Sequence, residues 1–143
     1  MKGKCNCSKV SFAVNSEVVG LYQCHCKLCQ RQSGSTSNTA TLVLEQNFEW
    51  LSGEQYITKW QKESGFSSHF CKICGSPVPN RLRDTHFYWI PMGSVDTCKA
   101  KVISHICCNS KASWDVLSDH VNRLDGMPDD IELFINSFQR KSE

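Results

Sequence analysis

Three cysteines within six residues constrain the chain more than any other feature. They are Cys24, Cys26 and Cys29 of the segment Cys-His-Cys-Lys-Leu-Cys. In a tight turn, Cys-x-Cys and Cys-x-x-Cys spacings let the thiols point toward one ion while the backbone wraps around it. A structural zinc site has four protein ligands, whereas a catalytic site commonly has three and keeps a position for water or substrate. The triplet therefore raises the question of a functional metal.

Two further cysteine pairs give this count its meaning. Cys5 and Cys7 form a Cys-x-Cys pair, and Cys71 and Cys74 form a Cys-x-x-Cys pair. Together they offer the four thiolates that a tetrahedral structural zinc requires. If these two pairs share one ion, a zinc ion at the central triplet would be one protein ligand short. That site would then be open.

Length and charge bound the class of protein. We expect residues 1–143 to form a single domain, small enough for bound metal to influence its stability. The net charge of +2, with acidic and basic residues interspersed, is unlike the concentrated basic surface of nucleic-acid-binding proteins. The N-terminus lacks the apolar segment of a secretion signal, and no apolar run is long enough to span a bilayer. We therefore expect a cytoplasmic protein with neither nucleic acid nor a membrane as partner.

The ten cysteines have two other interpretations. A disulfide scaffold is typical of short secreted chains, but it fits poorly with the missing secretion signal and with such closely clustered cysteines. A thioredoxin-like redox motif needs a helix directly after its Cys-x-x-Cys pair. Gly75, Pro77 and Pro79 follow Cys74 and disfavour a helix there. Metal binding remains the favoured interpretation.

The apolar pattern predicts a mainly β chain. Short strands are expected over residues 10–14, 18–23, 39–44, 48–51, 56–60, 66–70, 85–92 and 101–106. The third, fourth and fifth of these runs suggest an antiparallel meander. Two strands lead directly into Cys24 and Cys71, so both metal-binding turns should lie at strand ends. Gly75 should permit a tight turn, and Gly34 should end a short helical turn over 30–33.

The last thirty residues predict helices instead. Apolar residues at helical spacing behind Pro128 indicate a helix over about 128–139: Ile131, Phe134, Ile135 and Phe138. Leu117, Val121 and Leu124, with Ser113 as N-cap and Gly126 beyond the end, suggest an earlier helix. The chain should thus have a helical C-terminal extension over about 113–139.

Four segments resemble one known family. They are Gly3-Lys4-Cys5-Asn6-Cys7, Cys24-His25-Cys26-Lys27-Leu28-Cys29-Gln30-Arg31, Phe70-Cys71-Lys72-Ile73-Cys74-Gly75-Ser76-Pro77 and Gly93-Ser94-Val95-Asp96. Their order and spacing are similar to those of the glutathione-dependent formaldehyde-activating enzyme family, which includes centromere protein V-like proteins. Ser104-His105-Ile106 and Trp114 match weaker positions, so the resemblance spans roughly residues 3–114.

The resemblance implies a β-tent-like zinc-binding fold with two zinc ions. A structural ion would be held by Cys5, Cys7, Cys71 and Cys74, and an ion with an open coordination position by Cys24, Cys26 and Cys29. The implied activity is that of a carbon-sulfur lyase on a small-molecule thiol or thiol-aldehyde adduct, S-hydroxymethylglutathione in the named enzyme. Membership does not fix the substrate. Ser8 stands where the family usually has glycine, so its turn must avoid positive φ or accept strain.

Other candidate site residues carry weaker predictions. Arg31, Ser33 and Ser35 follow the triplet and could contact substrate oxygens, or they could be solvated loop residues. His25 should point away from the ion, because it lies between two inward-pointing thiols. We expect His86 and His105 to be packed or exposed side chains without a functional role, and Cys98, Cys107 and Cys108 to be small buried residues. Cys98, Cys107, Cys108 or His105 could instead supply a fourth ligand. Two alternatives to an enzyme are a zinc-stabilised interaction module and a redox sensor that releases zinc on oxidation.

Overall fold

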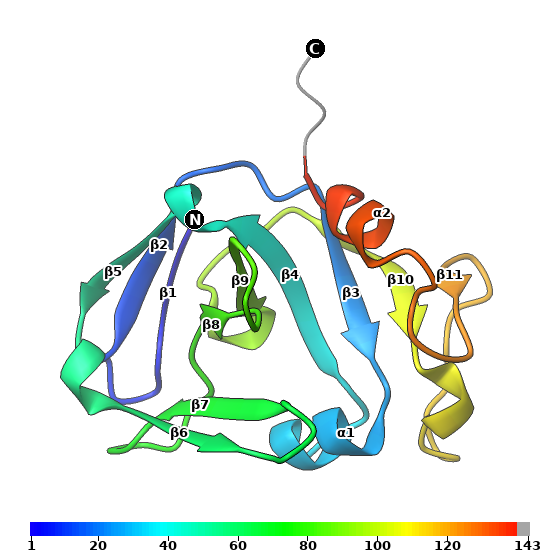
Figure 1. Cartoon of the computed structure of the whole chain (residues 1–143), viewed down its shortest axis with the longest axis horizontal. Helices are drawn as coiled ribbons and strands as arrows, with labels where there is room; N and C mark the ends of the chain where they lie inside the picture. Colours follow the sequence, from blue (N-terminus) through cyan, green and yellow to red (C-terminus); the bar gives the residue numbers. More distant parts are fainter. Residues whose placement is uncertain (140–143) are drawn as a thin grey trace. The chain divides into compact units, whose positions relative to one another are not determined.

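A computed structural model describes residues 1–139 (Figure 1). The chain is mainly β, with short antiparallel sheets and few helices, which confirms the predicted fold class. Its contacts define two compact units. Unit 1 comprises Met1–Glu17 and Leu42–Lys99, and unit 2 comprises Val18–Thr41 and the chain from Ala100 onward. The single domain expected from the sequence stays a prediction.

Unit 1 contains a three-stranded sheet and two hairpins. The antiparallel sheet has the order β1-β2-β5, formed by β1 (Lys2–Lys4), β2 (Ser11–Val14) and β5 (Phe48–Ser52). The hairpins pair β6 (Ile57–Gln61) with β7 (Ser67–Cys71), and β8 (Asn80–Arg81) with β9 (Phe87–Pro91). The connections include the 3-10 helices η1 (Glu45–Asn47), η2 (Glu54–Tyr56) and η3 (Met92–Ser94).

Aromatic packing holds the sheet of unit 1 together. Phe48 stacks on Phe12 at 5.8 Å between ring centroids and on Tyr88 at 4.2 Å. Gly3 lies opposite Phe12 in the β1-β2 pair, and a Cβ atom at Gly3 would come within 2.4 Å of the Phe12 ring and 2.7 Å of the Ser94 carbonyl oxygen. A side chain would therefore clash at this position. The strand that leads to Cys5 can pack closely only because it carries glycine.

Unit 2 is organised by two parallel strands that are distant in sequence. β3 (Gly20–Cys24) pairs with β10 (Lys101–Ile106), and their last residues, Cys24 and Ile106, are partners. β4 (Asn38–Leu44) is antiparallel to β3, and β11 (Asn122–Arg123) is parallel to β10. The described residues of this unit also form α1 (Lys27–Ser33), the 3-10 helix η4 (Cys108–Ser110) and α2 (Ile131–Asn136). Because parallel strands end at the same edge, the segments after β3 and β10 begin side by side.

Two expectations from the sequence are wrong. The runs 39–44, 48–51 and 56–60 form strands but no meander, since β4 pairs with β3, β5 with β2 and β6 with β7. No helix forms over residues 113–124; turns occupy this segment, and its end forms β11. The terminal helix is confirmed but shorter than predicted, because it begins after Asp130, whose carboxylate accepts a hydrogen bond from the Leu133 N–H at 2.9 Å.

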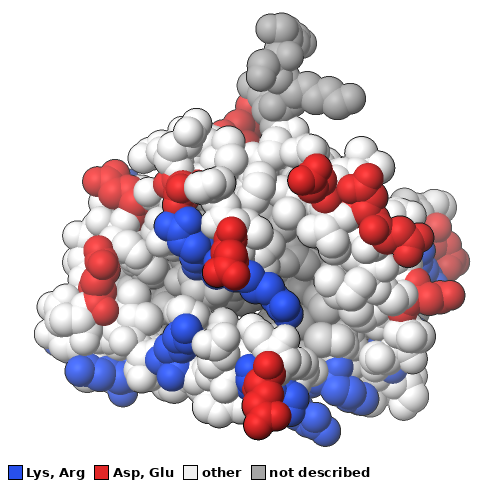
Figure 2. Space-filling model, viewed as in Figure 1, with Lys and Arg blue, Asp and Glu red and all other residues white. Residues whose placement is uncertain are grey.

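The surface charge and the apolar character of the helices can also be described. Acidic and basic side chains both occur on the face shown in Figure 2, in keeping with the nearly balanced composition. Within residues 1–139, none of the helices combines the length and the apolar character needed to cross a membrane.

Candidate metal centres

The first cysteine cluster lies within unit 1 and has four members. Cys5 and Cys7 lie in the turn after β1, Cys71 ends β7, and Cys74 lies in the turn that follows. Their four sulfur atoms are all within 4.8 Å of one another. The Cys7 sulfur is 3.5 Å from that of Cys5 and 3.7 Å from that of Cys71. Thiolate ligands of tetrahedral zinc are roughly 3.8 Å apart for Zn–S bonds of about 2.3 Å, so the arrangement fits zinc.

Backbone conformation brings these four thiols together. Gly75 has φ of 77° and donates its N–H to the Cys71 carbonyl at 2.7 Å, which closes the turn that carries Cys74. Ser8 has φ of 65°, so the turn accepts the left-handed conformation that glycine would adopt more easily. The Asn6 N–H donates to Ser76 Oγ at 3.0 Å and ties the two turns together. The strain expected at Ser8 is thus present in the structure.

The surroundings of this cluster act unequally on its thiols. Despite a backbone hydrogen bond at Lys9, burial and the neighbouring thiols raise the pKa of Cys7 to about 11. Hydrogen bonds from the side chain and backbone of Ser76 lower the pKa of Cys74 to about 5. Cys5 and Cys71 are buried together with Val10 and Val78, and Trp50 packs against the same group. Four converging sulfur ligands in a water-poor environment are typical of a structural zinc site.

The second cluster lies within unit 2 and has three members. Cys24 ends β3, Cys26 is the N-cap of α1 and accepts a hydrogen bond from the Cys29 N–H at 3.4 Å, and Cys29 lies in the helix. Gly34, with φ of 65°, ends α1. The three sulfur atoms are within 4.8 Å of one another, and among residues 1–139 this group has three members. The three cysteines predicted from the sequence therefore converge in a cluster that could hold a metal ion.

The chemistry of this donor set also fits a metal dication. The pKa of Cys24 is raised by its hydrogen bond with the Cys29 thiol and by burial, and burial raises the pKa of Cys26. Without a cation, Cys24 and Cys26 thus resist becoming thiolates. A bound zinc ion would compensate this cost, because it stabilises the deprotonated form of each ligand.

One further thiol lies beside the triplet. Cys107 follows the end of β10, is buried, and has φ of 56°. Burial and the neighbouring Cys24 thiol raise its pKa to about 12. Its sulfur is 3.6 Å from Met127 Sδ and is not among the three that converge within 4.8 Å. Cys98 is exposed and Cys108 is partly buried, so neither follows the prediction of a fully buried packing residue.

His25 lies in a buried network that the sequence did not predict. Its side chain is fully buried, and its Nε2 atom is 2.9 Å from Nδ1 of the buried His105. Its Nδ1 atom is 3.5 Å from Oδ2 of Asp115, and neither of these two buried atoms has another hydrogen-bond partner. His25 therefore points into the interior of unit 2, not toward solvent, and supports the triplet without joining it.

Gln30 holds the two adjoining segments together. Its amide donates hydrogen bonds to the His25 carbonyl at 2.6 Å and to the Ser110 carbonyl at 2.9 Å. The His25 N–H donates to the Ile106 carbonyl at 3.0 Å. One of these hydrogen bonds closes the triplet turn itself, and the other two fix it to the end of β10 and to the segment that follows. The sequence predicted no role for Gln30 or Asp115, because a lone amide or carboxylate is usually a solvated surface group; Gln30 entered only as part of a segment that resembles the family.

The remaining candidates have local roles. Ser33 Oγ donates to the Gln30 carbonyl at 3.3 Å and accepts from the Ser35 N–H at 3.2 Å, so these serines cap the end of α1. Arg31 is exposed on the same helix. His86 is exposed in unit 1, where its Nδ1 atom is 2.8 Å from Glu45 Oε1. The structure brings none of these four side chains into the three-sulfur cluster.

The buried histidines predict a pH-dependent stability. Burial lowers the pKa of His25 and His105 in the folded protein, while the unfolded chain regains a pKa of about 6.5. Below about 6.5 the unfolded state therefore binds more protons, and the free energy of unfolding should fall as the pH falls. Urea unfolding between pH 7.5 and 5.5 should show this loss, with a smaller loss in His105→Gln.

The matched control is His120→Gln, which removes an exposed histidine of unit 2. Its unfolding free energy should follow the same pH dependence as the unmodified protein. A pH dependence of His105→Gln identical to that of the unmodified protein would show that the buried pair does not contribute.

Comparisons with known proteins agree with this picture. The family model described as glutathione-dependent formaldehyde-activating enzyme matches residues 1–110, and the chain belongs to this family. A search of curated proteins gave no match. A crystal structure of a Rhodobacter sphaeroides protein aligns with a TM-score of 0.56 and 19% identity, over 71% of this chain and 99% of that one. At this level of identity, the similarity to the Rhodobacter sphaeroides structure shows the fold alone.

Proposed function

We propose that the protein is a zinc-dependent carbon-sulfur lyase that acts on a thiol-aldehyde adduct. The observation that carries the proposal is the convergence of three cysteine sulfur atoms, and no fourth ligand among the described residues, in a chain of this family. A zinc ion held by Cys24, Cys26 and Cys29 would lower the pKa of a thiol at its remaining position and favour the thiolate. The four-cysteine cluster of unit 1 would hold a second, structural zinc.

The proposed reaction is the cleavage of a hemithioacetal, R–S–CH2–OH. The carbon-sulfur bond breaks and its electron pair goes to sulfur, while the hydroxyl group loses its proton and becomes the carbonyl of formaldehyde. The released thiolate and the proton together make the free thiol, so the step needs no other reactant. S-hydroxymethylglutathione, with glutathione as its thiol, is the first adduct to test because of the family.

The residues around the triplet have supporting roles in this proposal. Both ring nitrogens of His25 face buried partners, so His25 orients the turn and is not a general base for the substrate. Gln30 fixes the same turn to the segment after β10. Arg31 is exposed on α1 and remains a predicted contact for substrate carboxylates.

One observation favours the alternative of a non-catalytic zinc module. Cys107 is a buried thiol next to Cys24, and a modest movement could make it a fourth ligand. Four thiolates would close the site to substrate. The two functions therefore differ in whether the metal at the triplet accepts an external thiol.

Exchange spectroscopy at equilibrium tests the activity. Glutathione and formaldehyde combine spontaneously, so the measured quantity is the interconversion rate above that of the mixture without protein. We expect clear acceleration by the unmodified protein and by Cys98→Ser, a matched change at an exposed cysteine outside both clusters, but not by Cys26→Ser. The visible spectrum of cobalt-substituted protein should also change when thiol is added.

The opposite results select the alternative. Two negative results together would contradict the lyase. The protein would accelerate neither this pair nor other small thiols and aldehydes, and the cobalt spectrum would not change when thiol is added. If that spectrum then changed in Cys107→Ser, the closed interaction module would replace the enzyme.

A further inference from the structure

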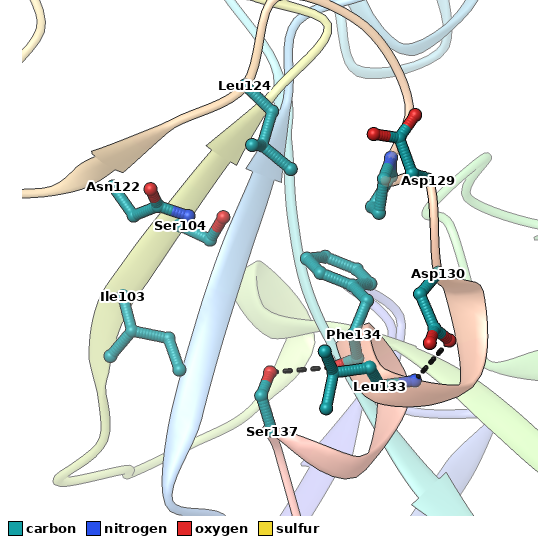
Figure 3. Close-up of a pocket in the computed structure, with 10 residues that line it drawn as sticks. Ile103, Ser104, Asn122, Leu124, Asp129, Asp130, Leu133, Phe134 and Ser137 are labelled. Carbon is teal, nitrogen blue, oxygen red and sulfur yellow. Dashed lines mark hydrogen bonds between the residues drawn. The ribbon is translucent and has the colours of Figure 1, made fainter.

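A second site lies in unit 2, in a groove between β10 and the segment that carries α2. Its volume is about 430 Å³, and its walls are mostly apolar (Figure 3). The residues that line it include Ile103, Ser104, Leu124, Leu133 and Phe134. β11 and α2 come after residue 110, so most of the groove is built by the part of the chain beyond the family match. The groove therefore depends largely on residues outside the matched segment.

The inner wall carries a polar atom that has no partner. Ser104 is 6% exposed, and its Oγ atom is buried without a hydrogen bond. It directly follows a register shift between β10 and β3 that falls between Val102 and Ser104. Such bulges redirect side chains and are frequent beside functional sites. An unpaired buried hydroxyl costs free energy, which a hydrogen-bonding group bound in the groove would recover.

The middle of the groove offers apolar contact that is open to solvent. Ile103 is 39% exposed and Leu133 is 68% exposed, and in Figure 3 the partly buried Phe134 lies next to Leu133. Phe134 is held by Tyr22, at 5.3 Å between ring centroids, so it presents a fixed surface. Gly20 makes room for Ile103, since a Cβ atom there would lie 2.4 Å from its Cδ1 atom. A flat apolar group would pack well in this space.

The outer rim is acidic. Asp129 and Asp130 line the groove and are exposed, and Asp130 also caps α2. Figure 2 shows acidic side chains gathered over the segment between β11 and α2. The rim therefore favours a cation and disfavours a carboxylate.

From these three zones we propose that the groove binds a small organic cation: a primary ammonium group joined by an apolar, preferably aromatic, body to a hydroxyl group. The ammonium pairs with Asp129 and Asp130 at the rim. The aromatic body packs against Phe134 and Leu133, and the hydroxyl group makes the hydrogen bond that Ser104 lacks.

Tyramine is the probe, and three molecules of similar shape serve as controls. Phenethylamine lacks the hydroxyl group, tyrosol replaces the ammonium with an alcohol, and 3-(4-hydroxyphenyl)propionate reverses the charge. Binding is measured by calorimetry and by NMR shifts of the groove residues. Tyramine should bind about tenfold more tightly than tyrosol, because a hydrogen bond to a charged group contributes roughly one factor of ten in affinity. The propionate should not bind.

Substitutions in the groove test which residues bind tyramine. Asp129→Asn with Asp130→Asn should weaken tyramine about tenfold while asparagine preserves the cap of α2. Ser104→Ala should make tyramine and phenethylamine bind equally. Asp84→Asn, an exposed change in unit 1, is the control and should bind tyramine as the unmodified protein does.

Two results would overturn the site: tyrosol or the propionate binding as tightly as tyramine, or no NMR shift in the groove up to the solubility limit of tyramine. Neither depends on the cysteine triplet, so this outcome is separate from that of the lyase assay.

Discussion

Cys71→Ser should yield protein that is insoluble or poorly folded in unit 1. Cys71 is fully buried, and through the Cys7 sulfur, 3.7 Å away, it joins the end of β7 to the turn after β1. Zinc contributes about 10–16 kcal/mol to folding in small zinc domains, which is comparable with the roughly 7–21 kcal/mol of net stability expected for a chain of this length. Circular dichroism during heating, together with the soluble yield, measures the effect.

The matched control for this prediction is Cys98→Ser, which changes an exposed cysteine of the same unit that belongs to neither cluster. It should melt as the unmodified protein does. A soluble Cys71→Ser protein with unchanged melting would refute the structural role of the four-cysteine cluster.

Cys26→Ser should have a different effect. The substitution removes one of three ligands at the triplet, whereas the cluster of unit 1 keeps all four of its own. The metal content should fall from about two ions per chain to about one. Most β structure should remain, because the Cys5-to-Cys74 cluster still ties its turns together, and any lyase activity should be lost.

Elemental analysis and far-ultraviolet circular dichroism of the same preparation separate loss of metal from loss of fold. If Cys26→Ser and Cys71→Ser collapsed to the same extent, the two clusters would not differ in the roles assigned to them.

The strands could be predicted from sequence because local alternation reflects burial. Phe12 and Val14 are buried in β2, as their alternation with Ser11 and Ala13 indicated, although Ala13 is buried too. Pairing was not predictable in the same way. β3 pairs with β10, whose first residue comes 77 positions after Cys24 (101 − 24), and nothing local in either strand specifies that partner.

The helix predicted over 113–124 failed because its apolar residues have no surface to cover. Leu117 and Val121 are only partly buried, and a short helix without a packed face is marginal in water. The backbone there pairs with β10 instead: the Leu124 N–H donates to the His105 carbonyl at 2.8 Å. The helix propensity of this segment is thus overridden by backbone pairing with the edge of β10.

The metal clusters were predictable, and the network behind them was not. Cysteine spacing indicates which thiols can share an ion, so all seven residues were predicted as ligands from the sequence, and in the structure they converge in two clusters. His25, His105 and Asp115 meet only because β3 and β10 end together. Their partnership is a property of topology, which spacing along the chain does not record.

The distribution of ligands along the chain also sets an order of assembly during translation. The three triplet thiols emerge from the ribosome together, whereas Cys5 and Cys7 must wait for Cys71. The interval from Cys29 to Cys71 is 42 residues (71 − 29), or roughly 2–8 s at about 5–20 residues per second. The nascent chain therefore presents the proposed open site before the four-cysteine cluster of unit 1 is complete.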